Sequence, residues 1–322
     1  MALNSVIGNA LSGLRASQLG LRTASNNVAN VNTPGYARTE LAITSRNVAG
    51  QGMGVDVRGV ERITDEYLLA ASVRANSDFS AATARYSALD RLQAQFGSTS
   101  DESSIFGRLN AAFDSLSAAA ADSAETVARL SAASELQTFF DETQRLSVEM
   151  RTLRNEADTR IGSGIGRINE ILKEMQDLNL QAQSLNASSA DTSGAANRQV
   201  ELLDELSSYI DVRTNRQPDG RVFVSTADGV ALLDNSRLQL EYTPAGTGAY
   251  GLDYGEITAV VSASGARVDL TQNITSGELR GLIDLRDKDL PQLAAALAEY
   301  SAGAADALKA SNSYFQDLFS QV

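Results

Sequence analysis

Few side chains in this sequence are able to do chemistry. The 322 residues include neither histidine nor cysteine, which excludes cysteine nucleophiles, serine–histidine pairs, disulfides, and zinc or haem sites built on those ligands. Carboxylates remain available for acid–base work, but the side chain whose usual pKa lies nearest neutrality is missing. Catalytic residues are therefore not expected, and the chain is not predicted to be an enzyme.

Two short patterns resemble ligand sites and fail on detail. Residues 162–166 read GSGIG, which differs from the G-x-G-x-x-G of a dinucleotide loop and follows a helical pattern instead of a strand. Asp284, Asp287 and Asp289 suggest a cation site. However, basic residues alternate with them at an expected helix start, where carboxylates favour the helix dipole. We expect no metal and no cofactor.

The composition narrows the classes of partner. The formal net charge is −13 and 43% of residues are hydrophobic, so a sizeable core is expected while nucleic acid and anionic membranes are disfavoured. No apolar run approaches the roughly 20 residues of a membrane-spanning helix. The N-terminus lacks the basic and apolar regions of a cleavable signal peptide.

The N-terminal residues 2–31 are predicted to form one amphipathic helix. Its apolar positions repeat every seven residues in two companion sets, Ile7, Leu14, Leu21 and Val28 with Leu3, Ala10, Ser17 and Ala24. A lone helix with so narrow a stripe is marginal in water and needs a partner helix. Thr33 before Pro34, followed by Gly35, predicts the helix end and a turn. The chain is then extended to Val60, with a short strand near its end.

The remainder predicts helices that flank a β-rich insert. A helix over 65–97 is expected to bury Phe79, Ala82, Tyr86, Leu89 and Phe96. A shorter helix follows, and then a long one with a bend at its glycines, residues 162–166. After a loop over 187–196 and a helix over 200–210, strands are expected at 221–226, 230–233, 237–242 and 256–261, and helix returns from 277.

The predicted fold class is therefore mainly α with an inserted β-rich domain (α+β), in a multi-domain chain with long heptad-patterned helices. Four segments are expected: a core helix with an assembly segment (1–62), a long-helix bundle (63–210), a β-rich outer domain (211–276) and a helical return to the bundle (277–322).

A sequence motif follows the N-terminal heptads. Residues 24–36 read ASNNVANVNTPGY and resemble the A-x-N-N-[IV]-A-N-x-x-T-x-G-[YF] signature of the flagellar axial proteins, the family of rod, hook and hook-associated proteins. The resemblance implies export by the flagellar type III system and polymerisation through the N-terminal helix. The residues expected to mediate assembly are Leu3, Ile7, Leu14, Leu21, Asn26, Asn27, Val28, Asn30, Thr33, Pro34, Gly35 and Tyr36.

Within that family, the hook-associated branch matches best. Residues 52–68, GMGVDVRGVERITDEYL, are similar to its G-x-G-V-x-V-x-x-[IV]-x-R-x-x-D-x-[FY]-L block, and residues 185–211 and 276–287 also resemble that branch. The resemblance implies a structural subunit of the extracellular flagellum at the junction of hook and filament. Its partners would be copies of itself, the hook protein, adjoining hook-associated or filament proteins, and an export chaperone.

Two alternatives stay open at this point. One is a rod or hook component of the same family, and the other is a secreted adhesin or hydrolase that carries the same export segment. The family also closes with a C-terminal heptad helix that pairs with the N-terminal one, and no such helix is evident before Val322. The working protein is therefore expected to be longer.

Overall fold

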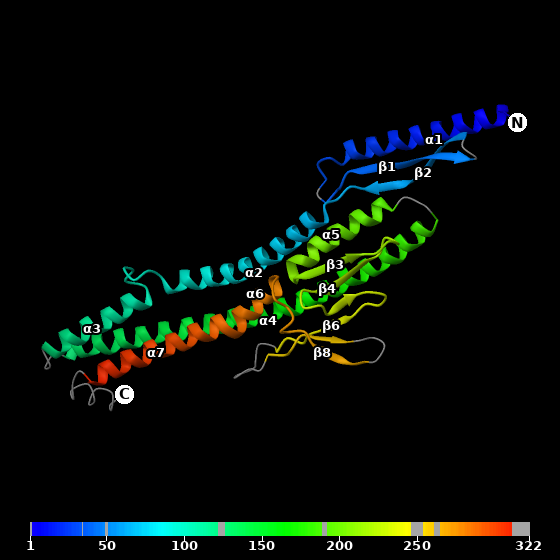
Figure 1. Ribbon diagram of the computed structural model, residues 1–322. Helices are drawn as coiled ribbons and strands as arrows, with labels where there is room; N and C mark the ends of the chain where they lie inside the picture. The colour runs from blue at the N-terminus through cyan, green and yellow to red at the C-terminus, as the bar shows by residue number, and fades with distance from the viewer. Residues whose placement is uncertain are drawn as a thin grey trace. The chain divides into compact units, whose positions relative to one another are not determined.

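The computed structural model describes residues 2–33, 35–48, 51–121, 126–188, 192–245, 254–260 and 265–310. The chain forms two compact units. The first comprises Met1–Ser80, Gly164–Tyr242 and Glu256–Leu279, and the second comprises Ala81–Ser163, Thr243–Gly255 and Arg280–Val322. Long helices alternate with small antiparallel sheets (Figure 1), which confirms the predicted class, mainly α with β-containing parts.

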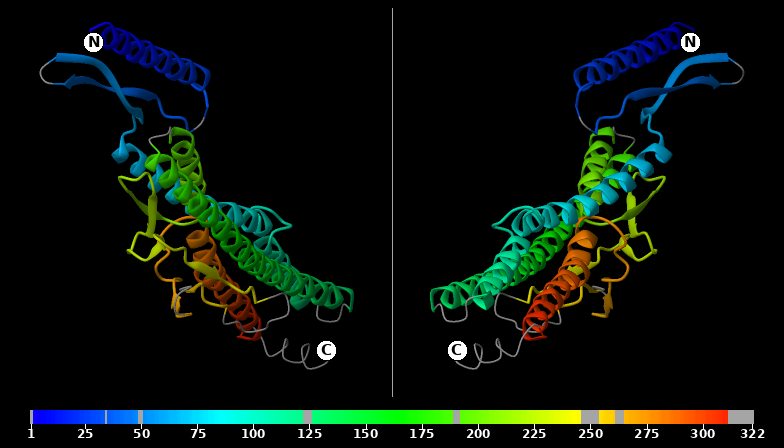
Figure 2. Two further views of the ribbon diagram at one scale, coloured as in Figure 1. Left: turned by 90° about the vertical axis from the view of Figure 1, so that its right-hand side faces the viewer. Right: turned by 90° about the vertical axis from the view of Figure 1, so that its left-hand side faces the viewer.

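The N-terminal part of the first unit is a helix on a long hairpin. Helix α1 (Ala2–Ala29) is followed by strands β1 (Thr39–Val48) and β2 (Gln51–Arg62), which pair antiparallel with Thr39 opposite Arg62. The register shifts after Ala42 and after Ser45, and such bulges bend a hairpin. Helix α1 runs alongside both strands in every view (Figures 1 and 2). The sequence predicted helix α1. Of the hairpin, it predicted only a short strand near Val60, which is the end of β2.

The rest of the first unit packs α5 (Ser193–Tyr209) and the later part of α4 (Thr126–Ala187) with two three-stranded sheets. One sheet has the order β3-β4-β5 and the other β6-β7-β8. Their bounds are β3 Val212–Arg216, β4 Val222–Thr226, β5 Ala231–Leu233, β6 Gln239–Glu241, β7 Thr258–Val260 and β8 Arg267–Asp269. Strands β3 and β8 were not predicted, and α5 begins earlier than the predicted residue 200.

Side-chain amides anchor the two sheets to α4. The Asn179 amide donates to the Val222 carbonyl oxygen at 2.9 Å and accepts from the Val222 N–H at 2.9 Å. Asn169 makes the same pair of bonds to Leu240, at 2.8 and 2.9 Å. Each amide therefore satisfies the outward-facing backbone of one strand, which fixes that strand on the helix.

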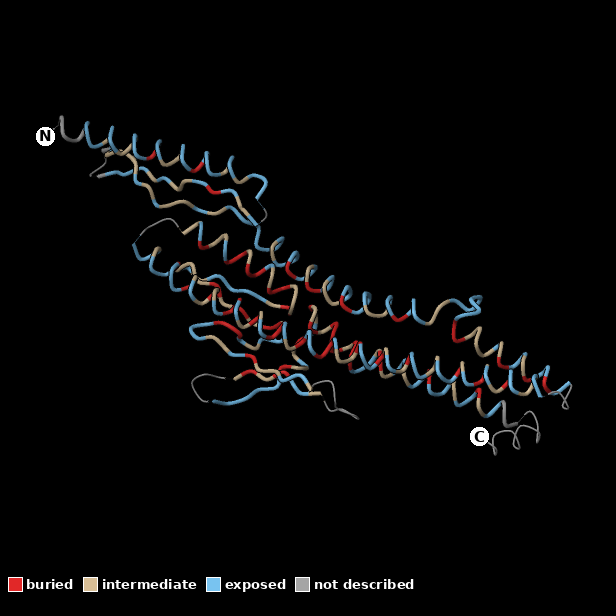
Figure 3. Tube along the Cα trace, turned by 180° about the vertical axis from the view of Figure 1, so that it is seen from behind, coloured by how far each residue is buried: buried red, intermediate tan, exposed pale blue. Residues whose placement is uncertain are grey.

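The second unit is a helical bundle. It contains the later part of α2 (Glu66–Phe96), α3 (Ile105–Ala121), the earlier part of α4 and most of the C-terminal helices. These are α6 (Glu278–Asp284), a π-helical turn η1 (Leu285–Asp289) and α7 (Leu290–Ala310). Phe139, Leu146 and Met150 of α4 are fully buried, and buried positions recur along that helix (Figure 3).

A buried ion pair lies within this bundle. The Arg286 guanidinium donates to the Asp158 carboxylate at 3.0 Å, and both side chains are 3% exposed. The ring of Tyr254 lies 4.4 Å from the same guanidinium, in a cation–π contact. Asp158 also accepts from the Ala245 N–H at 2.7 Å. The pair thus attaches the segment around Ala245 and Tyr254 to α4.

The predicted inner face of α2 is wrong. Phe79 and Tyr86 are 70% and 69% exposed, while Val73, Ser77, Ala84 and Leu92 are buried. The buried side is made mainly of smaller residues because another backbone approaches it closely. At Gly281 of α6, an added Cβ would overlap the carbonyl oxygen of Ala81.

The glycines at residues 162–166, where a bend or local loosening was expected, do not interrupt α4, which is one continuous helix. Glycine at 164 serves packing instead. A Cβ on Gly164 would lie 2.9 Å from Cδ2 of Leu279 and 3.5 Å from the ring of Tyr209, so a hydrogen there lets two neighbouring segments approach α4. Surrounding helix formers outweigh the modest helix penalty of these glycines.

The close crossing of α6 and α2 predicts opposite effects for two helical glycines. Gly281→Ala places a methyl group against the Ala81 backbone and should lower the free energy of unfolding by about 1–3 kcal/mol. Gly303→Ala has nothing within 4 Å of the new Cβ and should raise it by about 0.5–1 kcal/mol. Urea unfolding of both variants measures the difference. Equal changes in the free energy of unfolding for the two variants would contradict the close approach of α6 to α2.

Candidate assembly surface

Helix α1 uses its small and polar side to pack on the hairpin. Ala16 and Thr23 are 6% and 7% exposed, and Asn9, Ser12 and Asn27, on the same face, are part-buried. This face repeats at seven-residue spacing from 9 through 16 to 23, and it lies opposite the apolar heptads. Sequence reasoning assigned it no role, although the run of small and polar residues at helical spacing was a readable signal.

Hydrogen bonds join the first half of α1 to β2. The Ser12 hydroxyl accepts from the Val55 N–H at 3.2 Å and donates to the Asn9 carbonyl oxygen at 2.8 Å. The Asn9 side chain donates to the Gly52 carbonyl oxygen at 3.3 Å. Gly54 makes this approach possible because its φ is +93° and a Cβ there would overlap the Ser12 hydroxyl.

Asn27 holds the second half of α1 on β1. Its side-chain NH2 donates to the Thr39 carbonyl oxygen at 2.8 Å, and its Oδ1 accepts from the Thr39 N–H at 2.9 Å. The same Oδ1 accepts from the hydroxyls of Thr39, at 3.2 Å, and of Tyr36, at 2.9 Å. Because Thr39 is 4% exposed, its backbone groups depend on this single side chain for their hydrogen bonds.

The turn after α1 is built by the other motif residues. The Asn30 side chain donates to the Asn26 carbonyl oxygen at 2.9 Å and accepts from the Thr33 hydroxyl at 3.3 Å, which satisfies the end of the helix. Gly35 has a φ of +76°, and its carbonyl oxygen accepts from Arg62 at 3.3 Å. Pro34 lies outside the described residues. The motif therefore shapes the link between α1 and the hairpin.

The apolar heptads of α1 face away from the hairpin. Ile7 and Leu14 are each 56% exposed, Leu21 is 74% exposed and Val28 is 75% exposed. Val6, Leu11 and Val31 add to the exposed apolar surface, and the side chain of Leu3 lies outside the described residues. We call Ile7, Leu14, Leu21 and Val28 the α1 stripe. Figure 3 shows α1 as mostly exposed.

The acidic residues proposed as a possible cation site are each engaged by a basic side chain. Asp284 lies 2.8 Å from both Arg280 and Lys288. Burial alone would raise the pKa of Asp284, but hydrogen bonds from these two cations lower it below its usual value. Asp289 pairs with Arg85, and Asp287 with Arg286, each at 2.8 Å. The described residues include no group of three or more acidic side chains arranged to hold a metal.

The GSGIG segment lies inside α4 and forms no loop. A phosphate-binding loop needs backbone N–H groups free to point at the ligand, and within a continuous helix these groups are bonded to carbonyls one turn earlier. Among the described residues, no helix combines the length and hydropathy needed to span a bilayer.

Comparison with known proteins places the chain in a family. The family model described as "Flagellar hook-associated protein FlgK helical domain" matches residues 89–318. The chain belongs to the FlgK family of flagellar hook-associated proteins. A second model, "Flagella basal body rod protein", matches residues 7–36, which include most of α1 and the turn after it.

Curated relatives agree with this assignment. Flagellar hook-associated protein 1 of Salmonella typhimurium is 27% identical over 318 residues, which are 96% of this chain and 56% of that protein. The Escherichia coli protein of the same name is 26% identical over 315 residues, 95% of this chain and 56% of the relative. The Bacillus subtilis relative is 25% identical over 280 residues. The chain thus spans about half the length of the curated relatives it matches.

A solved structure has a similar fold. The flagellar hook junction protein FlgK from Burkholderia pseudomallei superposes with a TM-score of 0.58 at 21% sequence identity. The match covers 69% of this chain and 39% of that one. The likeness therefore extends over most of the present fold, while much of the relative has no counterpart here.

The Asn27 contacts predict unequal effects for two adjacent asparagines. Asn27→Ala removes every side-chain bond to Thr39 and should cost about 1–3 kcal/mol of local stability. Faster hydrogen exchange at the Thr39 amide would report that loss. Asn26→Ala is the matched control, because Asn26 is exposed and its backbone carbonyl, which the substitution keeps, accepts from Asn30 in the turn. Similar exchange in both variants would refute the role of Asn27.

Proposed function

We propose that this chain is a non-enzymatic structural subunit at the junction of the hook and the filament, and that the α1 stripe is its polymerisation surface. The supporting observation is that α1 is attached to its own hairpin through its polar face, so four heptad-spaced apolar side chains remain in water. Family membership supports a place in the flagellum, and the structurally similar Burkholderia pseudomallei protein is a flagellar hook junction protein.

The energetics favour helix–helix assembly. A heptad repeat of apolar side chains matches a partner helix in a left-handed coiled coil. Burying each of these side chains stabilises the contact by about 1.5–3 kcal/mol, although association offsets part of that gain. Several such contacts around a closed or helical array are enough to hold a subunit that is a stable monomer when free.

The proposed partners are further copies of the chain, the hook protein and the adjoining hook-associated or filament proteins, with an export chaperone before assembly. Export through the flagellar type III route and a final position outside the cell belong to the same proposal. The proposal keeps the four-segment organisation, with residues 1–62 as the assembly part. In that part, one face of α1 packs on the hairpin and the opposite face is offered for polymerisation. Leu3 joins the proposed surface on the heptad pattern alone, and Pro34 joins it on the sequence motif alone.

A rod or hook position is the second candidate, because the rod-protein family model matches residues 7–36. Gold-labelled antibody against residues 200–310 on isolated hook–basal bodies separates the two. Label confined to the distal end of the hook supports the junction, and label along the rod or the whole hook contradicts it.

The stripe predicts a defect in assembly without a defect in folding. Leu14→Asp with Leu21→Asp should change the stability of the free subunit by less than about 0.5 kcal/mol, because both side chains are exposed. The same pair should abolish filament attachment, since two carboxylates cannot be buried in an apolar helix contact. Thermal unfolding, secretion into the medium and filament counts by electron microscopy measure the three properties.

Arg15→Gln with Arg22→Gln is the matched control, because it changes the net charge equally on exposed positions of α1 that lie away from the α1 stripe. The control strain should carry normal filaments. Normal filaments in the strain with the two aspartates would sink the proposal.

A further inference from the structure

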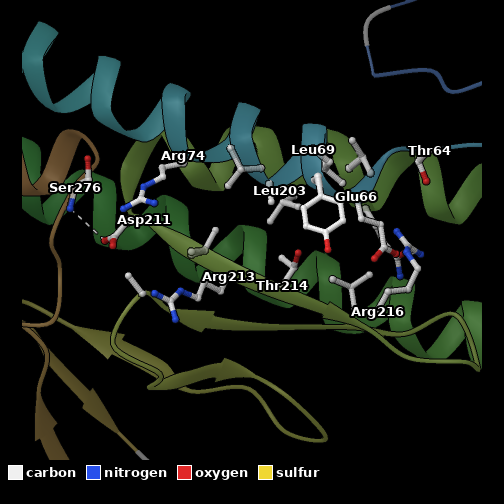
Figure 4. A pocket seen from close by; sticks show the side chains of 18 of the residues that line it. Thr64, Glu66, Leu69, Arg74, Leu203, Asp211, Arg213, Thr214, Arg216 and Ser276 are labelled. Carbon is white, nitrogen blue, oxygen red and sulfur yellow. Dashed lines mark hydrogen bonds between the residues drawn. The ribbon is translucent and has the colours of Figure 1, made fainter.

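A groove lies in the first unit between the beginning of α2 and strand β3. It encloses about 720 Å³ and has α5 and the segment at 275–276 in its lining. Figure 4 shows Leu69 and Arg74 of α2 on one side and Arg213, Thr214 and Arg216 of β3 on the other. We call it the β3 groove. Its volume is typical of a binding pocket, and it is separate from the α1 stripe.

Strand β3 is an unpaired edge along this groove. It has one neighbour in its sheet, β4, and its last four residues are exposed. Just beyond the strand, the Gln217 N–H donates to the Arg221 carbonyl oxygen at 2.8 Å, and Asn215 is paired with Phe223. Because hydrogen-bonded pairs alternate in an antiparallel ladder, Asn215 and Arg213 bond to β4, while Val212, Thr214 and Arg216 direct their N–H and C=O groups to the open edge.

The position of Val222 supports this alternation. Its N–H and C=O both bond to the Asn179 side chain of α4, so they do not point at its partner Arg216 on β3. Three residues of β3 therefore present donors and acceptors to the groove. Exposed edges of this kind are templates for an added strand.

The groove also gathers positive charge on an acidic protein. Four arginines line it, Arg62, Arg74, Arg213 and Arg216, although the whole chain carries a net charge of −13. Three acidic residues, Glu66, Asp78 and Asp211, also line the groove, so four arginines exceed the carboxylates by one charge. Asp211 lies with Ser276 at one end of the groove, and Arg216 lies at the other end (Figure 4).

Two of these guanidinium groups are close enough to repel each other. Burial lowers the pKa of Arg62, and the charge of Arg216 lowers it further. Arg216 is exposed as a residue, but the protein atoms around its guanidinium partly desolvate that group and lower its pKa, while Glu66 opposes this. The buried Nε of Arg62 has no hydrogen-bond partner among the described residues. A carboxylate brought to this end would relieve the repulsion and could accept that hydrogen bond.

We propose that the β3 groove binds an extended acidic segment of another protein chain, which adds a strand to β3 and places carboxylates on the arginines. The edge requires a ligand that both donates and accepts along a line, and a peptide backbone does both. A phosphate or a nucleic-acid backbone offers acceptors alone. Five residues of β3 span about 17 Å, so a segment of five or six residues fills the edge.

The test uses a labelled, acetylated six-residue peptide of alternating glutamate and valine, titrated into the intact chain and followed by fluorescence anisotropy. Saturable binding is expected, with slower hydrogen exchange at Thr214 and Arg216. A lysine–valine peptide should bind at least about tenfold more weakly because its charge is reversed. No saturable binding of the glutamate peptide, or equal binding of both peptides, would overturn the proposal.

Backbone pairing is tested on the unaltered protein. Two versions of the peptide are N-methylated, one on the glutamates and one on the valines, so that each loses a different half of its donors. Because only alternate residues of an added strand donate to β3, one version should bind like the parent and the other at least about tenfold more weakly. Equal loss in both, or in neither, would show that no strand is added.

Charge recognition is tested with variants. Arg213→Gln with Arg216→Gln should weaken the parent peptide at least about tenfold. Arg46→Gln with Arg58→Gln removes the same charge from exposed positions of the hairpin outside the groove and should leave binding unchanged. Equal weakening in both pairs, or displacement of the peptide by inorganic phosphate at matched ionic strength, would reduce the site to a general anion surface and overturn the proposal.

Discussion

Hydrogen bonds between α1 and the β1–β2 hairpin decide which side of that helix meets water. Asn27 satisfies the buried backbone of Thr39, and Ser12 accepts from the N–H of the part-buried Val55. Both side chains lie on the polar face, so this face must turn inward. The apolar heptads are then left exposed as a consequence of local folding. An amphipathic helix ordinarily packs the other way round.

That inversion is the basis of the proposed assembly. Apolar surface of this extent on one helix is unfavourable in water and is relieved by a partner with matching heptads. The small residues that let α1 approach the hairpin also keep the attachment compact, as at Gly54. The rest of the first unit and the helical bundle of the second have their own cores. Assembly through the α1 stripe therefore does not require the remainder of the fold to rearrange.

The long helices were predictable because their apolar periodicity extends over many turns. Which face of each helix is buried was harder to predict. On α2 the bulky residues Phe79 and Tyr86 suggested the core, yet the smaller residues are buried because α6 crosses there at backbone distance. A sequence shows side-chain size but not how near another backbone lies. The packing role of Gly164 was missed for the same reason.

Strand β3 and the first strand of the hairpin were missed for a different reason. Residues 212–216 read VRTNR, and four of them are exposed, so the alternation that signals a half-buried strand is absent. For the proposed assembly surface, the heptads predicted apolar positions that are exposed on α1, and their role in assembly stays a prediction. The role of Asn27 as an anchor to Thr39, with Tyr36 donating to the Asn27 side chain, depends on a hairpin whose first strand the sequence did not indicate.

The most direct measurement of the central claim is the reactivity of a thiol placed on the α1 stripe, since the chain has no cysteine of its own. Leu21→Cys should react fully with a maleimide in the free subunit and be protected in isolated hook–filament particles. Ala16→Cys, which faces the hairpin, gives the reactivity of a buried thiol in both states. A Leu21→Cys thiol that stays fully reactive in the assembled particles would contradict the account.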